Sequence, residues 1–282
     1  MCSSSSHVAA LPHRALLPNR QAPARSVRRC VPCCVVAGRR RCPRRPGPTT
    51  TTPPTRHRPP IPAAGQRTRC TATKGRLPGV AYRVVVLVSG SGTLLQALLD
   101  AQAAGALDAR IVAVGSDQPG CRALARAQDA GVDTFVVPMT TLLPRGSAAR
   151  QAWDEEFARA VDACSPDLIV LAGFMKLLGE PFMRRFAGRV INTHPAMLPA
   201  FPGAHAVRDA LTAGATTTGS SIFWVDDGVD TGSLIVQEPV PVHPGDDEDT
   251  LHERIKVTER RLLVATVNEL ARRAPAGDPT SV

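Results

Sequence analysis

From residue 83 onward, short apolar runs alternate with amphipathic segments, and this alternation constrains the fold more than any other feature of the chain. The run at 83–88 (RVVVLV) is continuous and β-branched, which predicts a parallel strand buried on both faces. Residues 94–104 then predict a helix with Leu95, Leu98 and Leu99 on one face. Further strands are expected at 109–114, 134–137, 168–172, 189–193, 221–225 and 233–239, and further helices at 121–130, 148–163 and 249–273. This order predicts a single α/β domain with a doubly wound, mostly parallel, Rossmann-like sheet and an antiparallel edge.

Charge divides the 282-residue chain into two parts. Residues 1–76 contain 16 Lys and Arg and no acid, so the remaining 18 basic residues face all 24 acids and leave residues 77–282 at about −6. We therefore expect no nucleic-acid binding by the larger part, because nucleic-acid-binding domains carry basic surfaces. The Pro- and Arg-rich composition of the first part cannot bury a core. We expect a disordered basic tail at 1–80, a folded domain at 81–275 and a disordered end at 276–282.

The basic first part has three competing interpretations. It is upstream sequence translated from a misplaced start codon, an organelle transit peptide, or a basic arm that binds nucleic acid. The first interpretation implies a bacterial cytoplasm and the second a plastid. Cys30, Cys33 and Cys34 resemble half of a zinc site, but a second pair with suitable spacing is missing. Only Cys121 and Cys164 lie beyond residue 76, which fits a reducing compartment, and no apolar run is long enough for a membrane span.

Ligands of doubly wound sheets bind outside the carboxyl ends of the strands, which selects the loops after residues 88, 172, 193 and 225. The first loop, 89–93 (SGSGT), has glycines that let backbone N–H groups approach a phosphate at a helix N-terminus. It lacks the third glycine of a dinucleotide fingerprint, since Leu95 stands there, and it lacks the lysine of a P-loop. The pattern favours a small phosphomonoester over NAD or ATP, and a plain strand-to-helix turn is the alternative.

Asn192 and His194 end the strand at 189–193. They are two residues apart in an extended backbone, so both side chains face the same way. An amide beside an imidazole can stabilise an oxyanion or move a proton, and a hydrogen-bonded structural histidine is the alternative.

The acidic loop at 226–232 offers a partner for His194. Asp230 stands between two residues that precede the next strand, and its carboxylate would favour the charged form of the His194 ring. Asp226 and Asp227 precede a glycine, which is the usual composition of a turn. The ligand spacing of a calcium loop is absent, so no metal is expected.

Residues 173–178 (GFMKLL) follow a buried strand. They either line a slot for a flat heterocycle or pack into the core.

Four segments together resemble the phosphoribosylglycinamide formyltransferase family of folate-dependent formyltransferases. They are SGSGTLLQ from Ser89, PDLIVLAGFMKLL from Pro166, INTHPAMLPAFPGAHAVRDAL from Ile191 and DDGVDTGSLIVQ from Asp226. The resemblance extends from about residue 83 to residue 274. It implies transfer of a formyl group from 10-formyltetrahydrofolate, the co-substrate, to the amine of glycinamide ribonucleotide in purine synthesis, without a metal.

The resemblance also implies roles for individual residues. His194 matches the catalytic histidine, Asn192 its partner, and Asp230 the carboxylate that keeps the histidine charged. The ribonucleotide and its phosphate are assigned to Gly92, Thr93, Leu94, Leu95, Gln96, Lys256 and Glu259. The folate is assigned to Arg150, Met175, Lys176, Leu177, Leu178, Asn192, Asp226, Asp227, Gly228, Val229 and Asp230. The chain departs from the family pattern at Leu94, Phe223, Lys176 and Ala196, where Asn, His, Arg and Ser are frequent.

Other functions remain open at this point. A related deformylase would use water as the acceptor and normally carries an amino-terminal regulatory domain, which residues 1–76 cannot form. A methionyl-tRNA formyltransferase normally adds a basic domain, whereas the larger part of this chain is acidic. A non-catalytic nucleotide- or folate-binding protein would share the scaffold, because a fold alone does not dictate function. An NAD-dependent oxidoreductase fits less well because the glycine fingerprint is incomplete. A monomer and a homodimer are equally compatible with the sequence.

Overall fold

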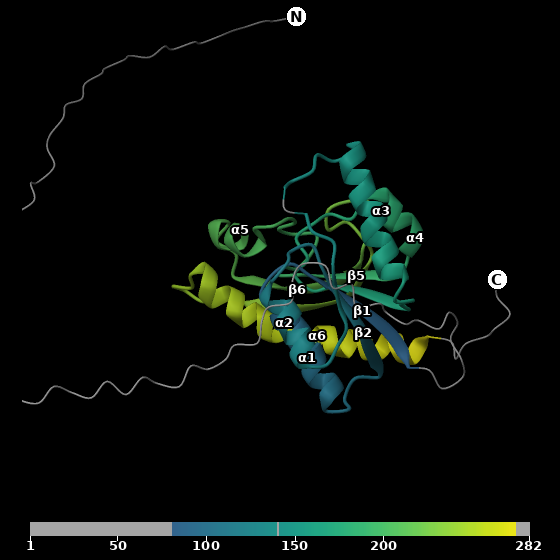
Figure 1. The fold of residues 1–282 in the computed structure, drawn as a ribbon. Coiled ribbons are helices and arrows are strands. Elements are labelled where there is room, and N and C mark those ends of the chain that lie inside the picture. Colours follow the sequence, from purple (N-terminus) through teal and green to yellow (C-terminus); the bar gives the residue numbers. More distant parts are fainter. Residues whose placement is uncertain (1–80, 140, 275–282) are drawn as a thin grey trace, which may run out of the picture. The chain divides into compact units, whose positions relative to one another are not determined.

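The computed structural model describes residues 81–139 and 141–274 (Figure 1). The tail and the carboxyl-terminal segment expected at 1–80 and 276–282, with the cysteine cluster at 30–34, lie outside these residues. The strands are β1 (Tyr82–Val88), β2 (Ala109–Ser116), β3 (Thr134–Val136), β4 (Leu168–Leu171), β5 (Val190–His194), β6 (Thr217–Trp224) and β7 (Leu234–Pro241). The helices are α1 (Thr93–Ala103), α2 (Arg122–Asp129), α3 (Ala148–Asp162), α4 (Glu180–Phe186), α5 (Ala206–Thr212) and α6 (Glu248–Arg273).

The strands form one sheet in the order β3-β2-β1-β4-β5-β6-β7. The first five strands of the chain are parallel where they pair, whereas β6 pairs antiparallel with β5, and β7 antiparallel with β6. The expected doubly wound α/β fold with an antiparallel edge is confirmed. The chain leaves β1 toward β2 on one side and returns to β4 on the other, which places the switch point of the sheet between β1 and β4.

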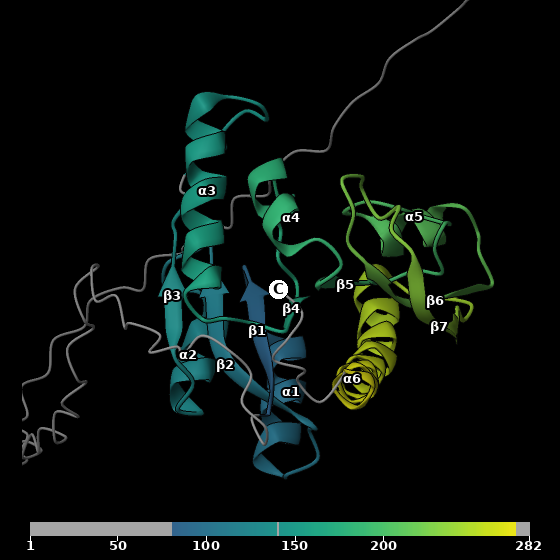
Figure 2. The ribbon, with the colours of Figure 1, turned by 90° about the vertical axis from the view of Figure 1, so that its right-hand side faces the viewer.

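Helices cover both faces of the sheet (Figure 2). On one face, α1, α2 and α6 bury an apolar cluster that includes Val86, Leu95, Leu98 and Leu263. On the other face, α3 and α4 bury a second cluster centred on Phe157, whose ring stacks on Trp153 at 4.9 Å. The exposure of Val84 to Val88 is 0% because helices cover both sides of β1, which is why this strand is a continuous apolar run.

Two short helices were absent from the sequence expectations. Both α4 and α5 have 7 residues, fewer than the periodicity of a helix needs to become visible in sequence. The apolar residues Phe182 and Phe186 of α4 nevertheless pack into the Phe157 cluster. In contrast, α5 packs with β7 and the first turns of α6 through Val207, Leu251 and Ile255.

Candidate active site

The imidazole of His194 is buried at the carboxyl end of β5, with an exposure of 4%. Its Nδ1 lies 3.5 Å from Oδ2 of Asp230. Its Nε2 lies 2.7 Å from the carbonyl oxygen of Phe201. A carbonyl oxygen only accepts, so Nε2 carries a proton. The Asp230 carboxylate faces Nδ1, so oxygen acceptors lie at both nitrogens of the ring.

Asp230 reaches His194 by a route that the sequence reasoning did not foresee. Because β6 is antiparallel to β5, its carboxyl end lies beside the start of β5, where Trp224 pairs with Ile191. The expectation that the loop after residue 225 joins the other strand ends directly was therefore wrong. The loop instead folds back and brings Asp230 to the His194 ring, while Gly232 packs closely against the Trp224 carbonyl oxygen.

The backbone conformation of Asp230 lets the loop after β6 fold back toward His194. Its φ is 54°, a left-handed conformation that Asp tolerates better than most residues. Its Oδ2 also accepts the Gly203 N–H at 2.8 Å, so the carboxylate joins two loops as well as facing the ring. The proximity of Asp230 and His194 that the sequence suggested is therefore observed.

Asn192 lies on the same face of β5 as His194 and is half-buried. Within the described part of the chain, its side-chain amide has no hydrogen-bond partner. It is therefore a donor that a ligand can use, next to the His194 ring.

The loop between β1 and α1 presents free backbone amides. Gly92 directly precedes α1 with a φ of 72°, and a Cβ there would lie 2.6 Å from Cβ of Ala123, so only glycine fits. The N–H groups of Thr93, Leu94 and Leu95 have no acceptor among the described residues, and no side chain caps the helix. Such amides bind phosphate oxygens well. The Leu94 side chain is buried in the core, so it makes no polar contact.

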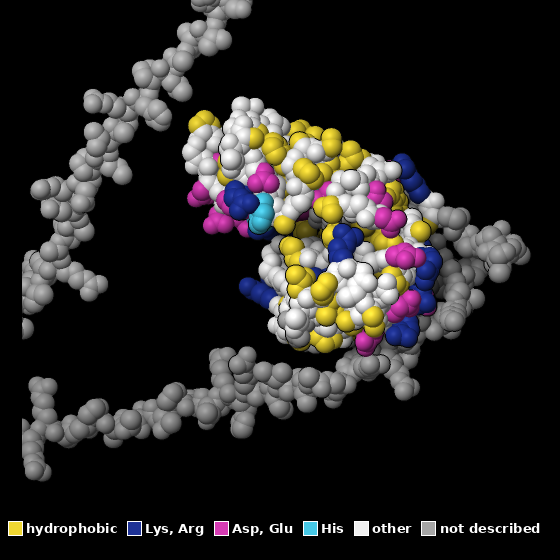
Figure 3. Space-filling model, turned by 90° about the horizontal axis from the view of Figure 1, so that it is seen from above, with side chains coloured by type: hydrophobic (Ala, Val, Ile, Leu, Met, Phe, Trp, Pro, Cys, Tyr) yellow, Lys and Arg dark blue, Asp and Glu magenta, His cyan; other side chains and the backbone are white. Residues whose placement is uncertain are grey.

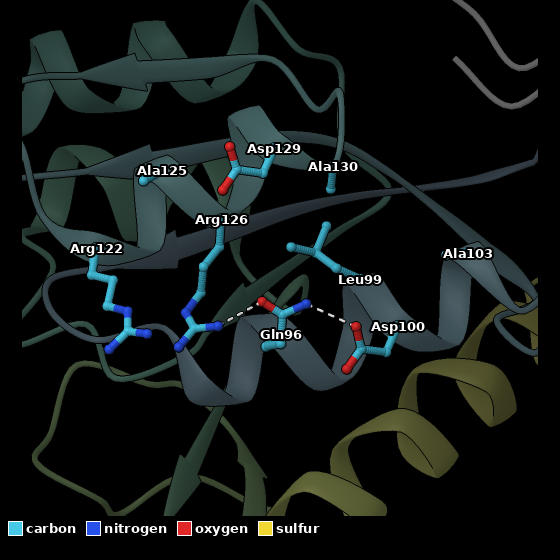
Figure 4. A pocket seen from close by; sticks show the side chains of 9 residues that line it. All are labelled: Gln96, Leu99, Asp100, Ala103, Arg122, Ala125, Arg126, Asp129 and Ala130. Atoms are coloured by element: carbon cyan, nitrogen blue, oxygen red, sulfur yellow. Dashed lines mark hydrogen bonds between the residues drawn. The ribbon is translucent and has the colours of Figure 1, made fainter. Parts of the chain in front are cut away.

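The Gln96 side chain is engaged away from that loop (Figure 4). Its oxygen accepts from Nη1 of Arg126 at 2.7 Å, and its Nε2 donates to Asp100 at 2.8 Å. Arg126 also donates to the Ser91 carbonyl at 2.9 Å. These contacts lie in a groove between α1 and α2. Gln96 and Arg126 thus shape the loop, and the Gln96 side chain is not a free phosphate ligand.

Glu259 lies on the opposite face of the sheet from His194, on α6. Its exposure is 4%, and its carboxylate accepts a hydrogen bond from the hydroxyl of Thr193 on β5. Burial raises the pKa of the Glu259 carboxyl, and the Thr193 hydrogen bond and nearby Lys256 offset only part of that effect. Lys256 itself forms an ion pair with Glu253 at 2.8 Å.

The segment assigned to folate, Met175 to Leu178, follows β4 at the switch point of the sheet. Met175 is 73% exposed and Leu177 is 41% exposed, which is unusual for apolar side chains of this size. Hydrophobic side chains are visible on the face that bears α3 to α5 (Figure 3). The N–H groups of Lys176 and Leu178 have no acceptor in the described chain. The segment therefore offers apolar contact and free amides, as a flat heterocycle needs.

A buried carboxylate holds this segment in place. Asp117, at the end of β2, is 0% exposed. It accepts hydrogen bonds from Ser89 at 2.6 Å and from Gln118 at 2.8 Å, and it lies 3.6 Å from Nζ of Lys176. Ser89 in turn accepts the Met175 N–H at 2.9 Å.

Arg150 has a supporting position in the structure. Its guanidinium is buried, pairs with Asp154 at 3.0 Å and donates to the Leu177 carbonyl. Asp154 also accepts the Gly179 N–H at 3.2 Å. Arg150 therefore supports the Met175–Leu178 segment, and its Nε and Nη2 donate to protein groups.

The acidic loop has a turn at its start, as the alternative interpretation held. Oδ1 of Asp226 accepts the Gly228 N–H at 3.0 Å and the Thr231 hydroxyl at 2.8 Å. Asp227, Gly228 and Val229 are exposed. Within residues 81–139 and 141–274, no three His, Cys, Asp or Glu side chains gather closely enough to hold a metal ion. In the same residues, no helix is both long and apolar enough to cross a bilayer.

Sequence reasoning missed several residues of the site. Asp117 ends a parallel strand, so the strand-end rule would have found it had it been applied to β2. Ser221, Gln237 and the Phe201 carbonyl carry no local signal, because their contacts depend on strand pairing and on the path of the loop after His194.

Comparison with known proteins shows the family of the chain. A model of the formyl transferase family matches residues 82–267. The chain belongs to the formyl transferase family. A phosphoribosylglycinamide formyltransferase of Mycobacterium tuberculosis is 54% identical over 194 residues, which are 69% of this chain and 87% of that protein. The enzyme of the same name from Escherichia coli is 37% identical over 67% of this chain and 86% of its own length.

Solved structures give the same result for the fold. Glycinamide ribonucleotide transformylase 1 from Symbiobacterium toebii superimposes with a TM-score of 0.64 at 39% identity, covering 69% of this chain and 89% of its own. The formyltransferase fold and the resemblance seen in the sequence are both confirmed.

Proposed function

We propose that this member of the family formylates the amine of glycinamide ribonucleotide with 10-formyltetrahydrofolate, and that Asn192, His194 and Asp230 are its catalytic residues. The observation that carries the proposal is the 3.5 Å approach of His194 and Asp230, beside an Asn192 amide that no described residue occupies. The relatives named above have this activity in their names, and they are similar along most of their length.

The bound 10-formyltetrahydrofolate supplies the formyl group from its N10. A bond forms between the substrate amine and the formyl carbon, and the bond from that carbon to N10 breaks. The amine loses one proton and N10 gains one, so atoms and charge balance. The protein needs no nucleophile of its own, because the amine is one.

The protein stabilises the negative charge that develops on the formyl oxygen. Asn192 supplies a hydrogen-bond donor, a contribution worth about 3–4 kcal/mol in comparable sites. The His194 imidazolium supplies positive charge next to that donor. The Phe201 carbonyl at Nε2 and the Asp230 carboxylate at Nδ1 fix the orientation of this ring beside the formyl oxygen. Proton transfer to N10 through water or His194 adds a rate factor of about 10²–10⁴.

We assign the other parts of the two substrates to groups of the site that protein atoms leave available. We assign the ribonucleotide phosphate to the amides of residues 93–95 and the sugar side of that substrate to Glu259. We assign the folate ring to the segment from Met175 to Leu178. We place the protein in a reducing, cytoplasmic setting, because only two scattered cysteines lie beyond residue 76. Both a monomer and a homodimer remain compatible with these assignments.

One assay tests the proposal. The purified chain is mixed with 10-formyltetrahydrofolate and either glycinamide ribonucleotide, initiator methionyl-tRNA or water alone, and loss of the formyl group is followed. We expect transfer to glycinamide ribonucleotide only. Release to water alone would indicate a deformylase, and no turnover at all would indicate a binding protein.

Variants test the residue roles in the same assay. His194→Ala and Asp230→Asn should lower kcat by about 10²–10⁴-fold, the usual contribution of a general acid or base. His243→Ala is the control, because His243 is exposed and lies outside the site. Near-normal turnover by either His194→Ala or Asp230→Asn would contradict the assignment.

A further inference from the structure

A row of polar side chains crosses the last three strands of the sheet. His194 on β5 pairs with Ser221 on β6, and Ser221 pairs with Gln237 on β7. Directly paired residues project from the same face of a sheet, so these three share the face that carries Asn192. Ser221 is 0% exposed and Gln237 is half-buried. The activity proposed above gives no role to Ser221 or Gln237.

The Ser221 hydroxyl uses its full hydrogen-bonding capacity on one loop and one side chain. It donates to the Ala196 carbonyl at 2.6 Å and accepts the Leu198 N–H at 3.1 Å. It also accepts from Nε2 of Gln237 at 2.9 Å. A hydroxyl has one donor and two acceptor sites, so all three are filled.

The Gln237 amide completes this arrangement. Its Nε2 donates to the Leu198 carbonyl at 2.7 Å and to the Ser221 hydroxyl at 2.9 Å, which uses both of its N–H groups. The backbone of Leu198 is therefore held at its N–H by Ser221 and at its carbonyl by Gln237. We call Ser221 and Gln237 the loop clamp.

The loop that the clamp holds is the one that holds the catalytic pair. It leaves His194, passes the clamp at Leu198, and then brings the Phe201 carbonyl to Nε2 of His194 and the Gly203 N–H to Asp230. The loop thus contacts the clamp near its start and both members of the pair near its end. A shift at Leu198 would move the two backbone groups that orient the ring and the carboxylate.

We propose that Gln237, acting with Ser221, is a positioning residue that sets the orientation and the protonated nitrogens of the His194 ring through the 196–203 loop. This inference rests on the proposed catalytic role of His194. Gln237 carries no charge and the clamp touches neither ring nitrogen, so its effect is geometric. Misplacement of a catalytic group by about 1 Å can cost about 10²-fold in rate.

The variant Gln237→Met tests the role, because Met fills a similar volume and donates no hydrogen bond. We expect kcat to fall by about 10- to 100-fold while KM for each substrate stays nearly constant. The limb of the pH–rate profile that reports His194 should shift. In ¹⁵N-histidine NMR spectra, the His194 signals should move toward a mixture of protonation forms, identified by their loss in His194→Ala.

Glu238→Gln is the matched control, since Glu238 is the next residue on β7, faces the other side and pairs with Arg261 on α6. It should leave kcat, the pH profile and the His194 signals unchanged. Ser221→Ala keeps the bond from Gln237 to the Leu198 carbonyl, so it should give a smaller change of the same kind. If Gln237→Met does not fold, as judged by circular dichroism, Ser221→Ala decides the question.

The proposal is overturned if the folded clamp variants keep the wild-type pH profile and His194 signals. It is also overturned if only the KM of one substrate rises, because Gln237 would then act on substrate binding. Failure of the proposed function looks different. In that case His194→Ala retains turnover, or the wild type has none, while the NMR measurement still reports whether the clamp orients the ring.

Discussion

The His194 ring is held at both nitrogens by groups from different parts of the chain. The Phe201 carbonyl lies 2.7 Å from Nε2, and the Asp230 carboxylate lies 3.5 Å from Nδ1. A ring held in this way has a defined orientation before the substrate arrives, which lowers the reorganisation needed during the reaction. Asn192 contrasts with it, because its free amide is left for the ligand.

Glu259 is the second titratable residue of the site that is held in an unusual environment. Burial favours its neutral form, so the pKa of the folded protein lies above that of the unfolded chain. The folded state then binds more protons than the unfolded state between these two values. The free energy of unfolding therefore falls as the pH rises from the unfolded pKa through the raised folded pKa.

We predict that Glu259→Gln abolishes this pH-dependent fall in the free energy of unfolding. Relative to the wild type, the variant should gain stability as the pH rises from the unfolded pKa of Glu through the raised folded pKa, because Gln cannot ionise. Urea unfolding at several pH values measures the difference. Glu253→Gln is an informative contrast, because the Lys256 hydrogen bond lowers the pKa of the Glu253 carboxyl. The difference in stability between this variant and the wild type should therefore change with pH in the opposite direction. A pH-independent difference for Glu259→Gln would contradict the prediction. In the formyl-transfer assay, KM for glycinamide ribonucleotide should rise.

At the scale of elements, the site is assembled from loops after β1, β4, β5 and β6. Three of these loops meet because their strands are parallel and end at one edge of the sheet. The fourth follows the antiparallel β6 and has to fold back to deliver Asp230. The Met175–Leu178 segment depends on yet another strand, because Asp117 at the end of β2 holds both Ser89 and Lys176.

We predict that Asp117→Asn loosens the Met175–Leu178 segment. The new amide nitrogen cannot accept hydrogen bonds, so Gln118 and Lys176 lose their common partner, at a cost of about 1–3 kcal/mol for unsatisfied buried groups. KM for 10-formyltetrahydrofolate should rise several-fold, while KM for glycinamide ribonucleotide stays nearly constant. Steady-state kinetics with each substrate varied in turn measures both. Asp108→Asn is the control, because Asp108 is exposed and pairs with Arg272 on α6. Equal changes in both KM values would contradict a folate-specific role.

At the scale of the molecule, all the contacts described for the site lie between Ser89 and Glu259. The family model covers the same region, residues 82–267. The basic charge of the chain, in contrast, lies in residues 1–76, and the rest is acidic. The part that carries the proposed chemistry is therefore distinct from the part that makes the net charge +10.

We predict that a chain beginning at residue 77 keeps the formyl-transfer activity. The strands and helices from Tyr82 onward complete one sheet with both faces covered, so residues 1–76 are not needed for that core. The full chain and the shortened chain are compared by kcat/KM and by thermal unfolding. A marked loss of either quantity in the shortened chain would show that the first part takes part in folding or catalysis.

The sequence alone determined the α/β class and the order of the long elements, and it suggested Asp230 as the partner of His194. Continuous apolar runs and helical periodicity are local properties, and the family motifs lie within short stretches of chain. The prediction from sequence missed α4 and α5, which are too short to show a period. It also placed the loop that carries Asp230 at the wrong end of its strand relative to His194. Only the tertiary structure decided that Arg150 and Gln96 are engaged by protein groups, that Asp117 supports the Met175–Leu178 segment, and that Ser221 and Gln237 hold the loop at Leu198. These facts depend on strand direction and register, which bring together residues far apart in the chain and leave no trace in local composition.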